Sequence, residues 1–128
     1  MILSISEHIY KTLRADSAVT DIVGNKMYPI GAKNEVQAPF LVYTRDSVDV
    51  GYDKAGRKYA DVRATVSCVA GSNDQALALA EAVIAALDKK IAVYNGFTVL
   101  DAIFTDATEG YSDDVFIQEV TFKFTISE

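Results

Sequence analysis

The chain has 128 residues, a net charge of −6 at pH 7, 50% hydrophobic residues and 23% charged residues. This length predicts a single domain, residues 1–128, that folds without a disulfide or a metal ion, and the composition excludes disordered and membrane classes. No apolar run approaches the ~20 residues that cross a bilayer, and the first residues lack the positive charge of a signal peptide. We therefore expect a cytoplasmic protein with no membrane partner. The negative charge also argues against nucleic-acid binding, which depends on lysine and arginine.

The only cysteine, Cys68, cannot form an internal disulfide. Val66 and Val69 beside it indicate a strand in the core, so we interpret Cys68 as a small buried residue and not as a nucleophile. No histidine or ligand cluster is spaced to accompany it. We expect no metal ion and no cofactor.

The first helix is predicted over residues 5–15. Ser4 and Glu7 have the spacing of a capping box, and Ile5, Ile9 and Leu13 form one apolar stripe. His8 lies off that stripe, so we expect it to be solvated.

A second short helix is predicted to begin at Asp16 or Ser17 and to end at Gly24-Asn25, two residue types that tolerate left-handed backbone. The extended segment that follows contains Pro29, which restricts it to a sheet edge or a strand end. Residues 31–38 are expected to form a polar loop.

Two strands are predicted in the middle of the chain. Residues 40–46 have the pattern of a half-buried strand, and Ser47 to Gly56 is expected to be a flexible loop because it contains two glycines and alternating charges. Residues 59–68 alternate between apolar and polar side chains, which is the firmest strand pattern in this half.

The longest helix is predicted over residues 73–90, after a capping box at Ser72 to Gln75, with Lys89 and Lys90 in its last turn. We expect its Leu77 and Ile84 to share one core with Val120 and Phe122 of the last strand. Its many alanines would let it approach a sheet closely.

The last third is predicted to be β-structure. Residues 91–94 and 97–104 flank Asn95-Gly96, the signature of a two-residue type I′ turn. Residues 105–114 are expected to be an acidic loop, and the last strand is apolar on one side at Val120, Phe122, Phe124 and Ile126. The order of elements predicts an α+β fold, with a mainly antiparallel sheet of about four to five strands and helices on one face: an N-terminal pair and one long central helix.

The sequence offers no conventional active site, because it has no phosphate loop, dinucleotide-binding glycines, nucleophile elbow or paired cysteines. Asp113 and Asp114 are interpreted as a solvated turn, because no histidine or lysine is placed to tune them as catalytic carboxylates. Tyr52 and Tyr111 lie in charged segments and fit either partner contacts or aromatics folded back on the sheet. The candidate contact residues are Tyr52, Asp106, Glu109, Tyr111, Asp113 and Asp114.

The whole order resembles the tail completion, or tail terminator, family of long-tailed bacteriophages. The resemblance rests on the turn from Val19 to Gly24, Met27-Tyr28-Pro29, the run from Pro39 to Tyr43, the helix after Ser72 and the aromatic last strand. It implies a structural protein of the virion tail, with no catalytic residues, that is assembled in the host bacterial cytoplasm. It also implies self-association into a ring, usually a hexamer, between the tail tube protein and the head connector.

A second class of function stays open at this point, namely a small host-encoded ligand-binding or regulatory domain that acts as a homodimer. A pocket lined by convergent polar groups would favour that class, whereas a flat edge able to form a ring would favour the virion protein. For a virion protein, the carboxylates of residues 105–114 would either repel DNA from the mouth of a tube or pair with a basic partner.

Overall fold

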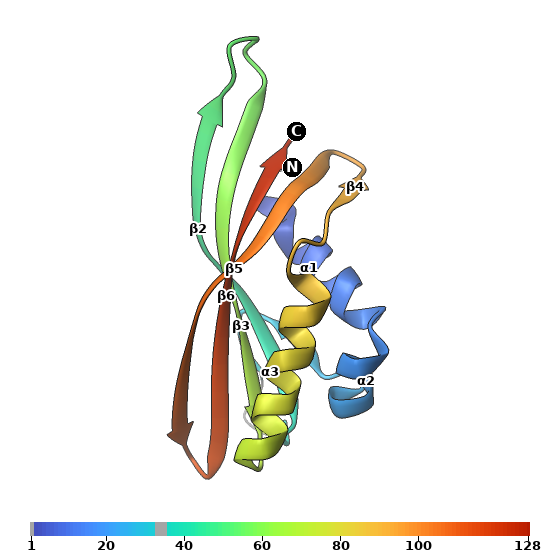
Figure 1. The fold of residues 1–128 in the computed structure, drawn as a ribbon, viewed down its shortest axis with the longest axis vertical. Coiled ribbons are helices and arrows are strands. Elements are labelled where there is room, and N and C mark those ends of the chain that lie inside the picture. Colours follow the sequence, from blue (N-terminus) through green and yellow to red (C-terminus); the bar gives the residue numbers. More distant parts are fainter. Residues whose placement is uncertain (1, 33–35) are drawn as a thin grey trace.

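The computed structural model describes residues 2–32 and 36–128. In chain order the elements are the 3-10 helix η1 (Ile2–Ser4), α1 (Ile5–Arg14), α2 (Ser17–Val23), β1 (Met27–Pro29), β2 (Phe40–Tyr52), β3 (Lys58–Ala70), α3 (Asn73–Leu87), β4 (Ala92–Tyr94), β5 (Phe97–Ser112) and β6 (Val115–Ser127). The helices gather on one side of the sheet (Figure 1). None of the described helices is long and apolar enough to cross a membrane. The predicted loop at 31–38 has irregular backbone where it is described, and residues 33–35 lie outside the described part.

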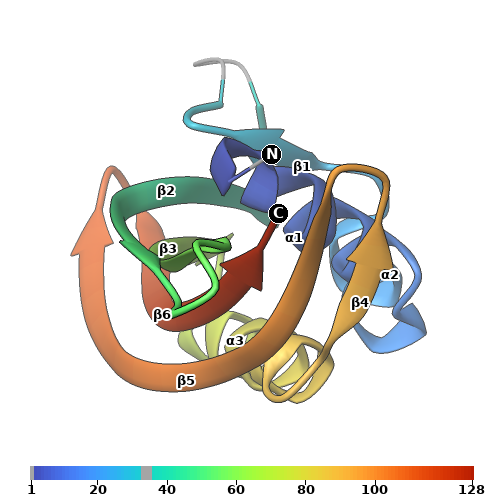
Figure 2. The same ribbon diagram turned by 90° about the horizontal axis from the view of Figure 1, so that it is seen from above.

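The sheet has six strands in the order β1-β2-β3-β6-β5-β4. Every neighbouring pair is antiparallel except β1 and β2, which are parallel. The α+β class is therefore confirmed, but the expected four to five strands were too few. The two outermost strands, β1 and β4, have three residues each, too few for a clear alternating pattern. Seen from above, the sheet is curled (Figure 2).

The core lies between the helices and the two central strands. The predicted inward residues of β3 and β6 are confirmed: each is at most 1% exposed, from Ala60 to Cys68 and from Val120 to Ile126. The prediction for Leu77 was wrong, because its side chain is 42% exposed, and Ile84 is only partly buried against the core. The helix face turned to the sheet is the neighbouring one, formed by Ala76, Leu79, Ala80, Val83 and Leu87.

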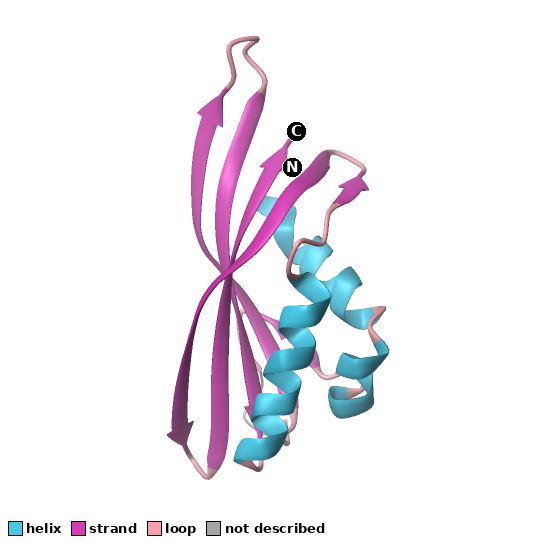
Figure 3. Ribbon diagram, viewed as in Figure 1, coloured by secondary structure: helices cyan, strands magenta, loops and turns pink. Residues whose placement is uncertain are grey.

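Two predicted loops are instead the outer ends of long hairpins. Of the segment Ser47 to Gly56, residues up to Tyr52 belong to β2, and of the segment 105–114, residues up to Ser112 belong to β5. The β2–β3 hairpin extends past the helices at one end of the sheet, and the β5–β6 hairpin closes the opposite end, near the start of α3 (Figure 3). A strand shows alternating hydrophobicity only where one face is covered, so these uncovered ends lack the pattern.

A β-bulge in β2 changes which residues face the helices. Arg45 is paired with Ala64 and Ser47 with Arg63, so Asp46 is an extra residue in β2. Before the bulge Leu41 and Tyr43 face the core. After it the even-numbered residues Val48, Val50 and Tyr52 lie on that face, opposite Val62, Ala60 and Lys58.

The helix ends agree with the sequence only in part. Asp16 Oδ1 accepts a hydrogen bond from Val19 N (3.2 Å) and Ser72 Oγ accepts one from Gln75 N (3.2 Å), which confirms both caps. Ser4 makes no side-chain cap bond, and Glu7 pairs with Lys11 instead (2.8 Å), so the first capping box was wrong. The long helix ends at Leu87, which leaves the two lysines that follow outside its last turn.

The two tight turns exchange the expected geometry. Gly96 has a positive φ of 97° but Asn95 does not, so Asn95-Gly96 is a two-residue turn without the two positive φ angles of type I′. Asp113 and Asp114, between β5 and β6, both have positive φ (51° and 64°). The two consecutive positive φ angles therefore occur in the turn between β5 and β6, at the acidic end of the sheet.

His8 is buried, which corrects the prediction that it is solvated. Its side chain is 0% exposed, and Tyr94 Oη lies 2.7 Å from Nδ1. The ring also meets Phe124 edge-on, with the ring centroids 5.8 Å apart. His8 borders the apolar stripe of α1, where Tyr94 of β4 packs, while Glu7, Lys11 and Arg14 on the opposite face are exposed.

Candidate partner-binding surfaces

The predicted contact residues separate into two groups at opposite ends of the sheet. Tyr52 lies at the end of β2 and is 64% exposed. Asp106, Glu109 and Tyr111 lie on the outer half of β5, and Asp113 and Asp114 form the turn to β6. All six side chains are exposed, but no single site brings Tyr52 together with the others.

The end of the β5–β6 hairpin is held by its own side chains. Tyr111 packs on Phe116, its register partner, with the ring centroids 4.8 Å apart, and its hydroxyl donates to Asp114 Oδ1 (3.2 Å). Gln118 Nε2 donates to Glu109 Oε2 (3.0 Å). We call this end, formed by Glu109, Tyr111, Asp113, Asp114 and Phe116, the acidic tip.

The acidic tip has no compensating base nearby in the chain. From residue 91 to residue 122 the sequence has six carboxylates and no lysine, arginine or histidine. Solvent-exposed carboxylates close to one another create a negative potential that attracts cations or a basic partner. The tip is therefore an anionic knob with an aromatic centre.

Asp106 belongs to a different surface from the rest of its group. It is paired with Thr121, on the sheet face turned away from the helices, and accepts a hydrogen bond from Thr105 Oγ1 (2.7 Å). We call this face, which none of the described helices covers, the open face. Its charged side chains, placed by the strand registers, are Asp49, Asp61, Arg63, Asp101, Asp106, Glu119 and Lys123.

The open face is polar, and its charges are predominantly negative. Asp49 stands directly opposite Asp61, and Arg63 directly opposite Lys123. Like charges opposite each other destabilise a sheet, and none of the ion pairs among residues 2–32 and 36–128 lies on this face. The alternating pattern predicts the polar side of each strand but not how the strands combine into one charged face.

We call the outer end of the β2–β3 hairpin the arm. An apolar groove lies where the arm meets η1. The groove, of about 460 Å³, is lined by η1 and by the inward side of the arm. Leu3 is 61% exposed and Val50 is 50% exposed there, beside Tyr52. We call it the arm groove, and its lining residues are Ile2, Leu3, Val48, Val50, Tyr52, Lys58 and Glu128. The sequence pattern places Val48 and Val50 in a flexible loop and assigns no role to Leu3, so the groove was not predicted.

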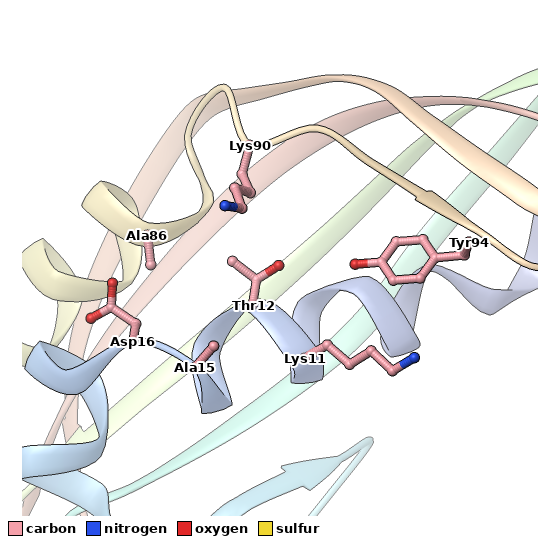
Figure 4. A pocket seen from close by; sticks show the side chains of 7 residues that line it. All are labelled: Lys11, Thr12, Ala15, Asp16, Ala86, Lys90 and Tyr94. Atoms are coloured by element: carbon pink, nitrogen blue, oxygen red, sulfur yellow. The ribbon is translucent and has the colours of Figure 1, made fainter.

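Another hollow, the polar crevice, lies between α1, the end of α3 and β4 (Figure 4). Lys11, Thr12, Lys90 and Tyr94 line it. Lys11 is already paired with Glu7 and lies 5.3 Å from the centre of the Tyr94 ring. Burial raises the pKa of Tyr94, so its hydroxyl stays protonated beside His8.

These side chains do not form a catalytic set. Cys68 is buried and burial raises the pKa of its thiol to about 12, which keeps it protonated. Among the residues that the structure describes, no group of three or more histidine, cysteine, aspartate or glutamate side chains is arranged to hold a metal ion. The surfaces with a chemical character are therefore the acidic tip, the open face and the arm groove, and each suits contact with a large partner.

Comparisons with known proteins agree with this picture. The family model described as "Tail completion protein gp17" matches residues 7–127. Among solved structures, a chain from a structure titled "Virion of native gene transfer agent (GTA) particle" has the same fold, with a TM-score of 0.73 and 22% sequence identity over 94% of this chain and 92% of that one. A comparison with curated proteins gives no significant match.

Proposed function

The chain belongs to the tail completion protein gp17 family, and from that premise we propose that it is a tail terminator. It is a structural protein of the phage tail, and its family is one of virion components and not of enzymes. In the proposed role, several copies form a ring on the head-proximal end of the tail tube, stop tube growth and join the tail to the head connector. The ring is assembled in the cytoplasm of the bacterial host.

The observation that best supports a ring is the pair of unpaired strand edges on opposite sides of one sheet. β1 pairs with β2 only at residues 41–43, and β4 pairs with β5 only at residues 97–99. Beyond those short strands, the outer edges of β2 and β5 meet no strand of the described part of the chain. Exposed edges invite pairing with another chain, and two different edges on one molecule suit a head-to-tail contact that closes on itself.

The experiment that tests this role uses the purified chain and purified tail tubes. We expect light scattering over a wide concentration range to show a closed oligomer, alone or on addition of tubes. Electron microscopy should show the added density at one end of each tube, and tubes incubated with the protein should stop elongating. A chain that stays monomeric at the highest concentration and does not bind tubes would contradict the proposed role.

The open face is the part of the molecule that we assign to the lumen. DNA passing through the ring would be repelled by carboxylates such as Asp106 and Glu119, because phosphate carries the same charge. The like-charged pair of Asp49 and Asp61 fits this assignment, since it costs stability in the monomer and adds to a predominantly negative surface. The acidic tip, which lies near the start of α3 at the end of the sheet opposite the arm, is assigned to contact with a neighbouring chain.

The lumen assignment is tested in assembled phage with the double variant Asp106→Asn/Glu119→Gln. Its matched control is Asp21→Asn/Glu81→Gln, which removes the same charge from exposed positions on the helices. Both variants should fold and join heads to tails, and only the first should deliver fewer genomes per particle. Equal genome delivery by the parent and both variants would contradict the assignment of the open face to the lumen.

A further inference from the structure

The arm groove and the acidic tip have complementary surfaces. The groove offers exposed apolar side chains, with Tyr52 at its outer end and Lys58 at its rim. The turn of the arm next to it adds two more cations, Lys54 and Arg57, against one carboxylate, Asp53. Glu128 also lines the groove and pairs with Lys58, so the groove is apolar at its base and has an excess of one positive charge at its outer end, from Lys54, Arg57 and Lys58 against Asp53 and Glu128.

The acidic tip has the opposite character. Tyr111 is 61% exposed although its ring is held by Phe116 and its hydroxyl by Asp114. An aromatic side chain that is already fixed loses little conformational entropy on binding, and tyrosine is frequent among residues that dominate interface energies. Three carboxylates surround it, those of Glu109, Asp113 and Asp114.

We propose that the acidic tip of one copy docks in the arm groove of the next copy. Tyr111 would lie against Leu3, Val50 and Tyr52, and the carboxylates of the tip would face the cations of the arm. This inference rests on the proposed ring and specifies the contact that holds it. The occupant is a second copy because the two surfaces lie at opposite ends of one sheet (Figure 1), so a single chain cannot join them.

The direction of this contact follows from its two different surfaces. One copy contributes a groove and the other a tip, so the interface is heterologous and repeats around a ring until the rotation closes. In the free chain Arg57 pairs with Asp53 (2.8 Å) and Lys58 with Glu128 (3.2 Å). Exposed pairs of this kind are weak, so these cations can turn toward the tip carboxylates. Most of the affinity should come from the apolar contact, and the charges should set orientation and association rate.

The test uses two variants that each destroy one half of the contact. The tip variant is Tyr111→Ser/Asp113→Asn/Asp114→Asn, in which asparagine keeps the positive φ angles acceptable. The groove variant is Tyr52→Glu/Lys54→Glu. Each alone should self-associate at least about tenfold more weakly than the parent. Mixed together, they should form a 1:1 complex of twice the 13.9 kDa of one chain and nothing larger, because the tip of the groove variant still fits the groove of the tip variant.

Analytical ultracentrifugation of the full chain measures these outcomes, with Val93→Ser as the control. Val93 is 80% exposed on β4, outside both surfaces, and its variant should assemble like the parent. Unfolding midpoints equal to that of the parent would show that every variant folds. Assembly of both variants at parental concentrations, or a mixture without the 1:1 complex, would overturn this contact while leaving the ring. If the parent never assembles, even on tail tubes, that result would contradict the proposed ring itself.

Discussion

At the residue scale, His8 shows how a polar side chain joins two elements. It is fully buried between α1 and β4, with Tyr94 Oη 2.7 Å from Nδ1. Burial is the main cause that lowers the pKa of His8. A hydrogen bond with the Lys90 backbone raises this pKa, and the positive charge of Lys90 lowers it. The folded protein therefore holds the imidazole neutral.

This burial predicts loss of stability in mild acid. The unfolded chain takes up a proton near the ordinary pKa of 6.5, whereas the folded chain does so only at lower pH, so protons favour unfolding. The contribution is complete above pH 6.5 and is lost as the pH falls from there toward the folded pKa, by at most about 1.4 kcal/mol per pH unit. Urea unfolding at pH 7.5 and 5.5 measures it. A His8→Gln variant, which cannot titrate, should lose less stability between the two pH values; an equal loss would show that other groups are responsible.

The sequence could not reveal His8 because an amphipathic pattern identifies only the principal buried face of a helix. Ile5, Ile9 and Leu13 mark the side of α1 toward the sheet and were placed correctly. The side covered by β4 depends on where a hairpin some 80 residues later folds back, since His8 and Tyr94 are separated by 86 positions. No local spacing contains that information.

At the scale of elements, the helix caps differ in what they contribute. Asp16 accepts a bond from the first turn of α2, so Asp16→Ala should destabilise the protein by about 0.5–2 kcal/mol. Ser4 occupies the matching position before α1 but makes no side-chain cap bond. The Ser4→Ala variant should therefore change stability by less than about 0.5 kcal/mol. Denaturant unfolding of the two variants would compare them, and equal effects would contradict the described cap geometry.

The pairing of α3 with β6 is tested by two apolar residues of opposite exposure. Phe122 is 0% exposed in the core, so Phe122→Ala should cost about 3–5 kcal/mol. Leu77 is 42% exposed, and Leu77→Ala should change the free energy of unfolding by less than about 1 kcal/mol. Thermal unfolding by circular dichroism ranks the two. A large effect at Leu77 in the isolated chain would mean that the helix is rotated from its described position.

Strand prediction was reliable where helices cover the sheet and failed where they end. The alternation of Val62 to Cys68 and of Val120 to Ile126 exists because one side of each strand is buried. From Thr105 to Ser112 every side chain of β5 is exposed, so burial imposes no period there. The candidate contact residues, whose role stays a prediction, were chosen for a related reason: charged and tyrosine side chains stand out when no core requires them. The aliphatic half of the arm groove was not predicted, because Val50 was predicted to lie in a flexible loop and the groove depends on η1 and β2 meeting in space.

At the scale of the whole molecule, η1, α1, α3 and the covered face of the sheet share one continuous core. We therefore expect one cooperative unfolding transition, as is usual for a single domain of this size. Tyrosine fluorescence and far-ultraviolet circular dichroism should give the same midpoint in urea, measured at a concentration where the chain is monomeric. Separate midpoints would divide the chain into independent units.

The bulge at Asp46 determines which chemistry each side of the arm presents. If Asp46 were paired in the ladder instead of bulged, the pleat would continue in its original phase, and Val48, Val50 and Tyr52 would turn onto the open face. Aliphatic side chains would then stand among the carboxylates, and the arm groove would be lined by Ser47, Asp49 and Gly51. The bulge thus acts as a phase shift that sorts the apolar and acidic halves of one hairpin to opposite sides. A chain without a residue at this position would present the same two surfaces with no bulge, so it is the bulge that lets β2 carry Asp46 without exchanging its faces.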